Sequence, residues 1–79
     1  MDGILHIGHL VKAELQRQGK TTTWLATQIG CSRINTYKIY KRPWITTDML
    51  YKVSAALHHN FFSDLSANFD AEFSTASNV

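Results

Sequence analysis

Apolar side chains recur every three or four residues along most of this chain, a spacing typical of helices that bury one face. Four such runs cover residues 7–18, 21–29, 32–41 and 46–57. Gly19 follows the first run and is expected to end it. The spacing predicts these inward positions: Ile7, Leu10, Val11, Leu15, Leu25, Ala26, Ile29, Thr36, Ile39, Tyr40, Met49 or Leu50, Val53, Ala56 and Leu57.

Residues that favour helix ends stand at the boundaries of these runs. Gly30 separates the second run from the third and permits a tight turn between the two helices. Pro43 bounds the third run because the residue before a proline avoids the helical conformation. Hydroxyl side chains precede the last three runs and are expected to cap them: Thr21, Ser32, and Thr46 or Thr47.

The C-terminal part of the chain changes in character after Leu65. Asn60 precedes the sequence FFSDL and is expected to cap a last short helix. Beyond Leu65 the composition shifts to small and polar residues, and the helical spacing is lost. We therefore expect one domain over residues 1–66 and a flexible tail over residues 67–79.

No stretch alternates apolar and polar residues like a strand, so the predicted fold is all-α, a compact bundle of about five short helices. A chain of 79 residues with 44% hydrophobic content has enough apolar side chains for one small core. Cys31 is the single cysteine, which excludes an intramolecular disulfide. The sequence shows neither a signal peptide nor an apolar run long enough to span a bilayer, so we expect a cytoplasmic protein.

Charge is unevenly distributed along the chain, whose formal net charge is +2. Between residues 12 and 42 the only acid is Glu14, whereas residues 60–79 contain three acids and no base. The basic residues of the first segment are Lys12, Arg17, Lys20, Arg33, Lys38, Lys41 and Arg42. One part of the molecule is therefore expected to carry positive potential, and a short helix that is basic on its outer face suits the major groove of DNA.

The segment TTTWLATQIGCSRINTYKI, at residues 21–39, has a specific spacing. Ala26 is small enough to let two helices cross closely, and Gly30 follows four residues later at the turn. This segment resembles the core motif of the Cro/repressor-type (XRE) helix-turn-helix family. The sequence TDMLYKVSAAL, at residues 47–57, resembles the helix that follows that motif in the family.

The resemblance covers roughly Ile7 to Leu65 and implies a lambda-repressor-like bundle whose third helix, about residues 32–41, lies in the major groove. It implies sequence-specific binding to double-stranded DNA by a transcriptional regulator. Single domains of this kind bind short sites weakly, so a homodimer on DNA is expected. The family further implies a bacterial or phage-derived protein that associates with the nucleoid.

The resemblance assigns roles to residues of the second and third helices. Base contacts are expected from the start of the third helix, where arginine suits guanine O6 and N7 and isoleucine suits a thymine methyl. These residues are Arg33, Ile34, Tyr37 and Lys38. Phosphate contacts are expected from Thr21, Thr22 and Thr23, at the start of the second helix, and from Asn35, Lys20, Lys41 and Arg42.

Two positions depart from the family pattern. Many members pair an arginine in the first helix with a glutamate at the end of the recognition helix, and Leu15 and Tyr40 stand at those positions here. An apolar contact is expected to replace the ion pair, which avoids the cost of burying two charges. The family often has glycine after the recognition helix, where this chain has Lys41-Arg42-Pro43, so the path of that loop stays open.

Several other residues have a structural interpretation that we prefer to a functional one. Trp24 is expected to cover the side of the bundle and Trp44 to pack against the fourth helix, rather than to stack on bases. Cys31 matches an inward position of the turn and is expected to be inert. We expect His58 and His59 to interact with the dipole at the end of the fourth helix.

The sequence contains no catalytic constellation, no phosphate-binding loop and no set of residues at metal-ligand spacing, so we expect neither an enzyme nor a cofactor or metal site. An alternative to a DNA-binding protein is an interaction module, such as an antitoxin-like or adaptor subunit. This alternative rests on four aromatic side chains that could hold a protein partner: Phe61, Phe62, Phe69 and Phe73. Phe61 is the one we expect in the core, with Phe62 at its edge.

Overall fold

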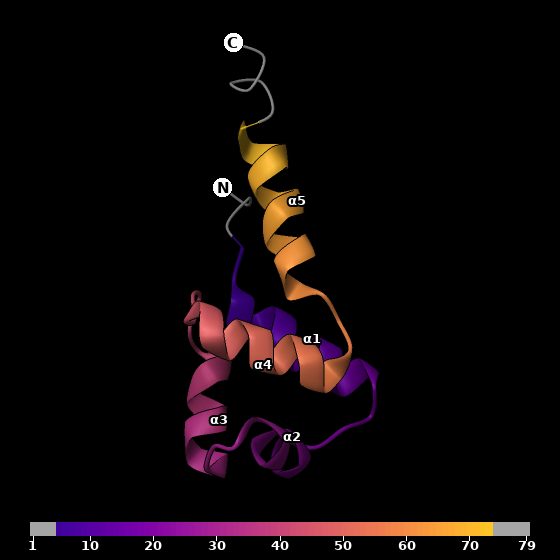
Figure 1. Ribbon diagram of the computed structural model, residues 1–79, viewed down its shortest axis with the longest axis vertical. Helices are drawn as coiled ribbons and strands as arrows, with labels where there is room; N and C mark the ends of the chain where they lie inside the picture. Colours follow the sequence, from indigo (N-terminus) through magenta and orange to yellow (C-terminus); the bar gives the residue numbers. More distant parts are fainter. Residues whose placement is uncertain (1–4, 74–79) are drawn as a thin grey trace.

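Five helices and the short loops between them make up residues 5–73, the part of the chain that this computed structural model describes. They are α1 (Ile7–Arg17), α2 (Thr22–Ile29), α3 (Arg33–Tyr40), α4 (Thr47–Leu57) and α5 (Phe61–Phe73) (Figure 1). Residues 5–73 contain no strand, so the predicted all-α fold of about five helices is confirmed. No helix in this part of the chain has the length and apolar character that crossing a membrane requires.

The helix boundaries follow the capping residues. Each capping hydroxyl accepts a hydrogen bond from the backbone N–H three residues later, at 3.0 Å for Thr21, 3.1 Å for Ser32 and 3.2 Å for Thr46. Thr46 is therefore the cap of α4, and Thr47 is its first helical residue. Gly30 ends α2 in the left-handed conformation, with φ of 71°, which glycine adopts without strain.

The core lies between α1, α2, α3 and α4 and is closed by the first turn of α5. Most of the predicted inward positions are buried, and Leu50 rather than Met49 provides the buried side chain at the start of α4. Leu10, Met49 and Ala56 are half-buried at the edge of the core. The buried apolar side chains are Ile7, Val11, Leu15, Leu25, Ala26, Ile29, Ile39, Tyr40, Leu50, Val53, Leu57 and Phe61.

The first turn of α1 is held tightly against the end of α3. The N–H groups of Ile7 and Gly8 donate to the carbonyl oxygens of Pro43 and Arg42, both at 2.9 Å. A Cβ atom at Gly8 would lie 2.5 Å from the Tyr40 carbonyl oxygen, so a larger residue would push the two helices apart. These contacts determine the path of the loop at residues 41–43.

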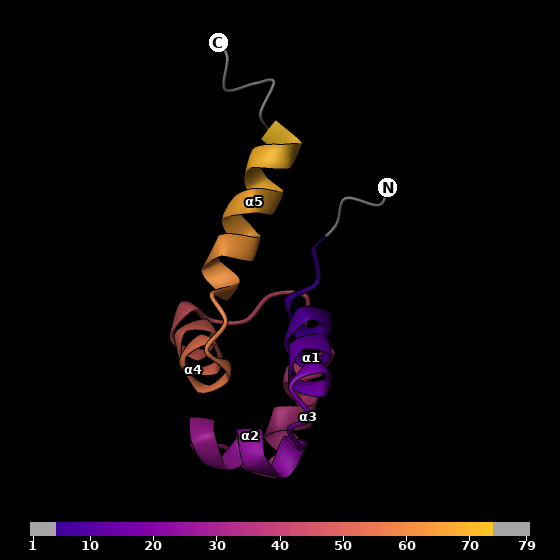
Figure 2. The ribbon, with the colours of Figure 1, turned by 90° about the vertical axis from the view of Figure 1, so that its right-hand side faces the viewer.

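The helix α5 extends away from the rest of the bundle and from the end that holds α2 and α3 (Figures 1 and 2). The predicted loss of helix after Leu65 is wrong, because α5 continues to Phe73. The apolar residues at Leu65, Phe69 and Phe73 keep a four-residue spacing, and no glycine or proline interrupts it. Of the tail expected at residues 67–79, the part after Phe73 lies outside the described residues.

Candidate nucleic-acid interface

The α2–α3 pair forms a helix-turn-helix whose turn is closed by backbone contacts. The Cys31 N–H donates to the Ala26 carbonyl oxygen at 3.0 Å, across the left-handed residue Gly30. In α3 the Thr36 hydroxyl is fully buried and donates to the Ser32 carbonyl oxygen at 2.9 Å. Ile39 is buried one turn later. These residues anchor α3 and fix which of its faces is directed outward.

The outward face of α3 brings together the predicted base-contact residues. Position 37 lies four residues after 33 and three after 34, and position 38 lies four after 34, so the four positions share one face of the helix. All four side chains are exposed: Arg33, Ile34, Tyr37 and Lys38. The ring of Tyr37 also packs edge-on against Tyr40, with 5.9 Å between the ring centroids, which holds it in place.

Cations near α3 have no carboxylate partner within residues 5–73, whereas two basic residues elsewhere do. Arg17 pairs with Glu14 on α1, and Lys52 pairs with Asp48 on α4 at 3.3 Å. The unpaired cations at α3 and the loop after it are Arg33, Lys38, Lys41 and Arg42. The acids Asp64, Asp70 and Glu72 lie on α5, which leads away from this surface (Figure 1). The two ends of the molecule therefore carry opposite charge.

The three threonines at the start of α2 differ in what their hydroxyls do. Thr21 caps the helix, and the exposed Thr23 side chain is not bonded to another side chain within residues 5–73. The Thr22 hydroxyl is half-buried and lies 2.9 Å from the Tyr40 hydroxyl. Thr22 can therefore offer a phosphate its backbone N–H, in the first turn of α2, but its hydroxyl is engaged within the protein.

The hydrogen bond between Thr22 and Tyr40 joins the start of α2 to the end of α3. Burial raises the pKa of the Tyr40 hydroxyl, an effect that the hydrogen bond from Thr22 opposes, so the phenol stays neutral at physiological pH. Leu15 is buried in the same core as Tyr40. Leu15 and Tyr40 are thus both buried in the apolar core, and the Tyr40 hydroxyl makes a contact that the sequence did not indicate.

Lys20 is placed beside α2 by an aromatic ring. Its ammonium nitrogen lies 4.7 Å from the centroid of the Trp24 ring, within range of a cation–π interaction. Trp24 is half-buried against the core, as predicted. Lys20 thus stands one residue before the Thr21 cap, on the same side of the bundle as the start of α2.

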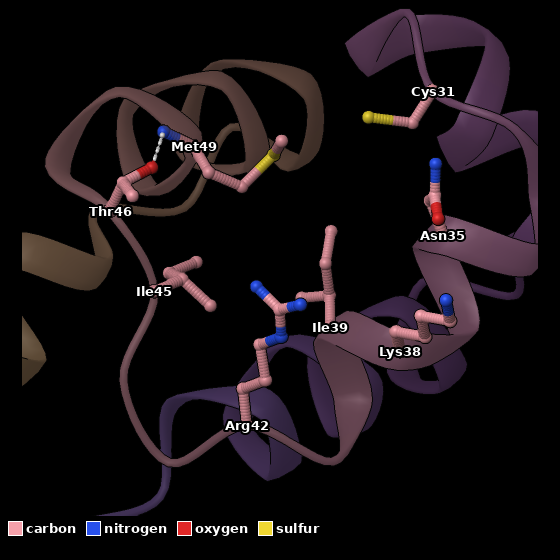
Figure 3. Close-up of a pocket in the computed structure, with 8 residues that line it drawn as sticks. All are labelled: Cys31, Asn35, Lys38, Ile39, Arg42, Ile45, Thr46 and Met49. Atoms are coloured by element: carbon pink, nitrogen blue, oxygen red, sulfur yellow. Dashed lines mark hydrogen bonds between the residues drawn. The ribbon is translucent and has the colours of Figure 1, made fainter.

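A pocket lies between α3 and the start of α4, on the side of Lys38 and Arg42 (Figure 3). It has a volume of about 340 Å³ and is hereafter called the α3–α4 pocket. Its lining consists of Cys31, Asn35, Lys38, Ile39, Arg42, Ile45, Thr46 and Met49. Cys31 is half-buried at its edge rather than fully enclosed.

Trp44 is placed differently from the prediction. It was expected to pack against α4, but 58% of its surface is exposed. It lines a pocket of about 450 Å³ together with Leu65, Phe69 and Phe73 of α5. The prediction is wrong because it ended the last helix at Leu65, and a longer α5 presents apolar side chains to this tryptophan.

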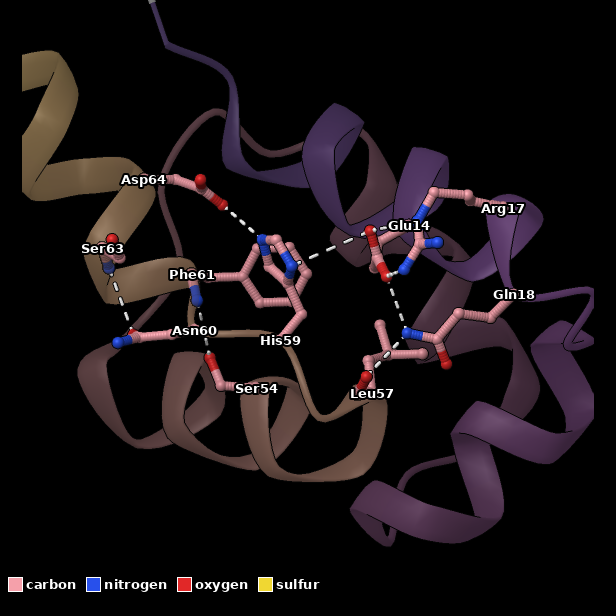
Figure 4. A network of polar contacts seen from close by, with 10 residues as sticks. All are labelled: Glu14, Arg17, Gln18, Ser54, Leu57, His59, Asn60, Phe61, Ser63 and Asp64. Atoms are coloured by element: carbon pink, nitrogen blue, oxygen red, sulfur yellow. Dashed lines mark hydrogen bonds and ion pairs between the residues drawn. The ribbon is translucent and has the colours of Figure 1, made fainter.

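A network of polar contacts joins α1 to α5 and was not predicted (Figure 4). His59 Nε2 lies 2.7 Å from Asp64 Oδ2, and His59 Nδ1 lies 3.8 Å from Glu14 Oε1. Gln18 donates to Glu14 Oε2 at 2.7 Å, and Arg17 Nε donates to Glu14 Oε1 at 3.0 Å. The pairs of Glu14 with Arg17 and Gln18 have the i,i+3 and i,i+4 spacing of helix neighbours, but no local signal predicts the contact between Glu14 and His59, which are far apart in the chain.

Glu14 is the buried centre of this network. Hydrogen bonds from Arg17 and Gln18 lower the pKa of its carboxyl from 4.5 to about 2. Because the pKa of Glu14 is lower in the folded state than in the unfolded chain, its ionised carboxylate stabilises the fold at pH values above the unfolded-state pKa. That contribution is lost as the pH falls from about 4.5 towards 2.

We therefore expect the free energy of unfolding of wild-type protein to exceed that of Glu14→Gln at pH 6, and the difference to shrink as the pH falls below about 4.5. Urea denaturation followed by circular dichroism at a series of pH values measures it. The control is Asp48→Asn, which removes an exposed pair with Lys52 and should change stability little at any pH. If the difference in free energy of unfolding between wild type and Glu14→Gln stayed constant down to pH 3, the role assigned to Glu14 would be contradicted.

Within residues 5–73 no group of three or more His, Cys, Asp or Glu side chains is arranged to hold a metal ion. His6 and His9 stack on each other, with 3.6 Å between the ring centroids, and His6 Nδ1 accepts the hydrogen bond that caps α1. His58 ends α4 in the left-handed conformation. The chain matches no protein-family model, and no curated protein or solved structure is significantly similar to it.

Proposed function

We propose that this protein binds double-stranded DNA sequence-specifically through α3 in the major groove, as a transcriptional regulator of the Cro/repressor-type (XRE) helix-turn-helix class. The observation that carries the proposal is the outward face of α3. It presents Arg33, Ile34, Tyr37 and Lys38 to solvent, on a helix anchored from behind by buried side chains. An exposed α-helix that is basic and rigidly anchored fits the width of the major groove.

The groups around α3 support phosphate contacts on both sides of the groove. The backbone N–H groups of Thr22 and Thr23 begin α2 and have no partner within that helix. Lys41 and Arg42 follow α3 and are exposed. In this proposal the backbone contacts position the protein, and Arg33 and Lys38 distinguish base pairs. The protein would act in the cytoplasm, on the nucleoid, by occupying an operator.

Selection of bound sequences from a random DNA pool tests the proposal. The expected result is an enriched consensus of one or two short half-sites, and a palindrome would show two-fold symmetric binding. The double variant Arg33→Ala, Lys38→Ala removes two exposed side chains and should enrich no consensus. Equal recovery of all sequences by the wild-type protein would exclude sequence-specific binding.

The aromatic surface on α5 favours a second function, in protein interaction. This α5 surface consists of Trp44, Leu65, Phe69 and Phe73, and the exposed fractions of its three aromatic residues are 58%, 61% and 47%. The Phe69 and Phe73 rings lie against each other with 4.7 Å between their centroids. Exposed apolar clusters of this kind mark sites of association.

The simplest occupant of the α5 surface is a second copy of the chain, which would give the homodimer expected on DNA. The helix α5 extends away from α2 and α3, so pairing along it would leave the proposed DNA surface free (Figures 1 and 2). The carboxylates of Asp70 and Glu72 beside it would repel each other across a dimer. Salt should therefore strengthen this association, while it weakens binding to DNA.

We expect wild-type protein to dimerise at high concentration and Phe69→Ser to remain monomeric under the same conditions. Sedimentation equilibrium over a range of concentrations measures the difference. The control Tyr51→Ser removes an exposed aromatic residue of α4 that is not part of the α5 surface. A different result would show an adaptor function instead. In that case the wild-type protein is monomeric alone and binds one other protein stoichiometrically, and the Phe69→Ser variant does not bind that protein.

A further inference from the structure

The α3–α4 pocket combines an apolar wall with a basic rim. Ile39 is buried, Ile45 and Met49 are half-buried, and their side chains form one side of the cavity. Figure 3 shows the guanidinium of Arg42 directed between Ile39 and Ile45, and the sulfur atoms of Met49 and Cys31 facing the same space. The wall is therefore a concave apolar surface that no side chain of residues 5–73 fills.

The polar groups at the rim are available for a ligand. Within residues 5–73, the side chains of Asn35, Lys38 and Arg42 form no hydrogen bond or ion pair. No carboxylate lines the pocket, and Asp48 at the start of α4 is paired with Lys52 at 3.3 Å. Two cations and an amide thus surround an apolar hollow in which no negative charge opposes them, and an anionic group would be attracted to it.

We propose that the α3–α4 pocket binds a small organic anion, with a carboxylate or phosphate group between Lys38 and Arg42 and an apolar body against Ile39, Ile45 and Met49. Its volume of about 340 Å³ lies at the lower end of the range for small-molecule sites. That size fits a ring or short aliphatic chain with one charged group. The apolar wall distinguishes this ligand from an inorganic ion, and the basic rim distinguishes it from a neutral apolar molecule.

Occupation of the pocket has a consequence that rests on the proposed DNA binding. Lys38 is assigned there to base contact, and Asn35 and Arg42 to phosphate contact. A ligand held by the same side chains would compete with DNA, since one cation cannot fully neutralise two anions at once. A small acidic metabolite bound in the pocket would then lower the affinity of the protein for DNA.

Phenyl phosphate is a suitable probe because it carries one anionic group on one aromatic ring. We expect saturable shifts of the Ile39, Ile45 and Met49 methyl signals in ¹H–¹³C spectra of the full chain, with a Kd on the order of 1 mM. Benzyl alcohol and inorganic phosphate should each bind at least about tenfold more weakly. If benzyl alcohol bound as tightly as phenyl phosphate, the site would recognise only apolar groups. If inorganic phosphate bound as tightly as phenyl phosphate, the site would recognise only the anion. Either result would overturn the proposal.

Variants separate the pocket from general electrostatic attraction. Lys38→Gln and Arg42→Gln should each weaken phenyl phosphate binding by about three- to tenfold, and both residues are exposed, so the fold should tolerate the changes. The control Lys12→Gln removes an exposed cation of α1 and should leave the affinity unchanged. A loss as large in Lys12→Gln as in Arg42→Gln would contradict a specific site.

A competition measurement tests the link to DNA. Saturating phenyl phosphate should lower the affinity of wild-type protein for a duplex containing the selected consensus by at least about threefold, at constant ionic strength. Methyl shifts that saturate without any change in DNA affinity would overturn the competition. Absence of DNA binding by every measure would overturn the proposed function, while the methyl shifts would still decide whether the pocket binds organic anions.

Discussion

DNA binding by this protein is expected to weaken by between about fortyfold and about five-hundredfold when the salt concentration rises from about 50 to about 200 mM. Each phosphate that a cation neutralises releases counterions, and the log–log slope is about −0.9 per phosphate contact. Five cations lie at or beside the proposed interface: Lys20, Arg33, Lys38, Lys41 and Arg42. The three cations assigned to phosphates, Lys20, Lys41 and Arg42, give a slope of about −2.7 for one domain, and all five would give about −4.5. Fluorescence anisotropy on the selected duplex measures it.

Two substitutions distinguish the electrostatic attraction to phosphates from the recognition of base sequence. Arg33→Ala should reduce discrimination between the consensus and a mismatched duplex by about 1–3 kcal/mol. Lys41→Ala should weaken binding to both duplexes equally and make the slope less steep by about one. The control Lys12→Ala lies on α1, outside the proposed interface, and should change neither quantity. A slope near zero for wild-type protein would exclude binding through the phosphate contacts proposed here.

The largest effect on stability is expected from Phe61→Ala. Phe61 is completely buried and is the residue through which α5 enters the core. Removing a buried phenyl ring typically costs about 3–5 kcal/mol. A domain of this size has a total stability of that same order, so the variant should be largely unfolded at room temperature. Thermal denaturation followed by circular dichroism measures the loss.

The matched control for this change lies two turns along the same helix. Phe69→Ala makes the same substitution on α5 at a largely exposed position and should cost little in the stability of the monomer. Both variants should be compared at low protein concentration, where association through the α5 surface does not add to stability. Equal losses of stability in the two variants would show that the whole of α5, and not only its first turn, packs against the core.

The first four helices could be predicted in detail because their signals are local. A capping hydroxyl and the backbone N–H that it accepts from are three residues apart, and Gly30 adopts its left-handed conformation where the motif requires a turn. Inward positions follow from spacing within one helix. The same local signals placed Arg33 and Lys38 on the outward face of α3, with Lys38 about one turn beyond Arg33.

The end of the chain was harder to predict because composition and spacing conflict there. Residues after Leu65 are small and polar, which favoured a tail, but Phe69 and Phe73 continue the helical spacing of α5. The position of Trp44 depended on that length. The prediction placed this side chain against α4, whereas it lines a pocket with Phe69 and Phe73 of the longer α5.

The sequence by itself determined the number and order of the first four helices, the caps of α2 and α3, and the basic outward face of α3. All of these depend on interactions within a few residues of the chain. Only the tertiary structure decided which polar groups remain free. It engages the Thr22 hydroxyl with Tyr40, brings His59 close to Glu14, and leaves Lys38 and Arg42 without a partner in residues 5–73, beside an apolar pocket. Such partners are brought together by packing between helices, and their spacing along the chain carries no record of that packing.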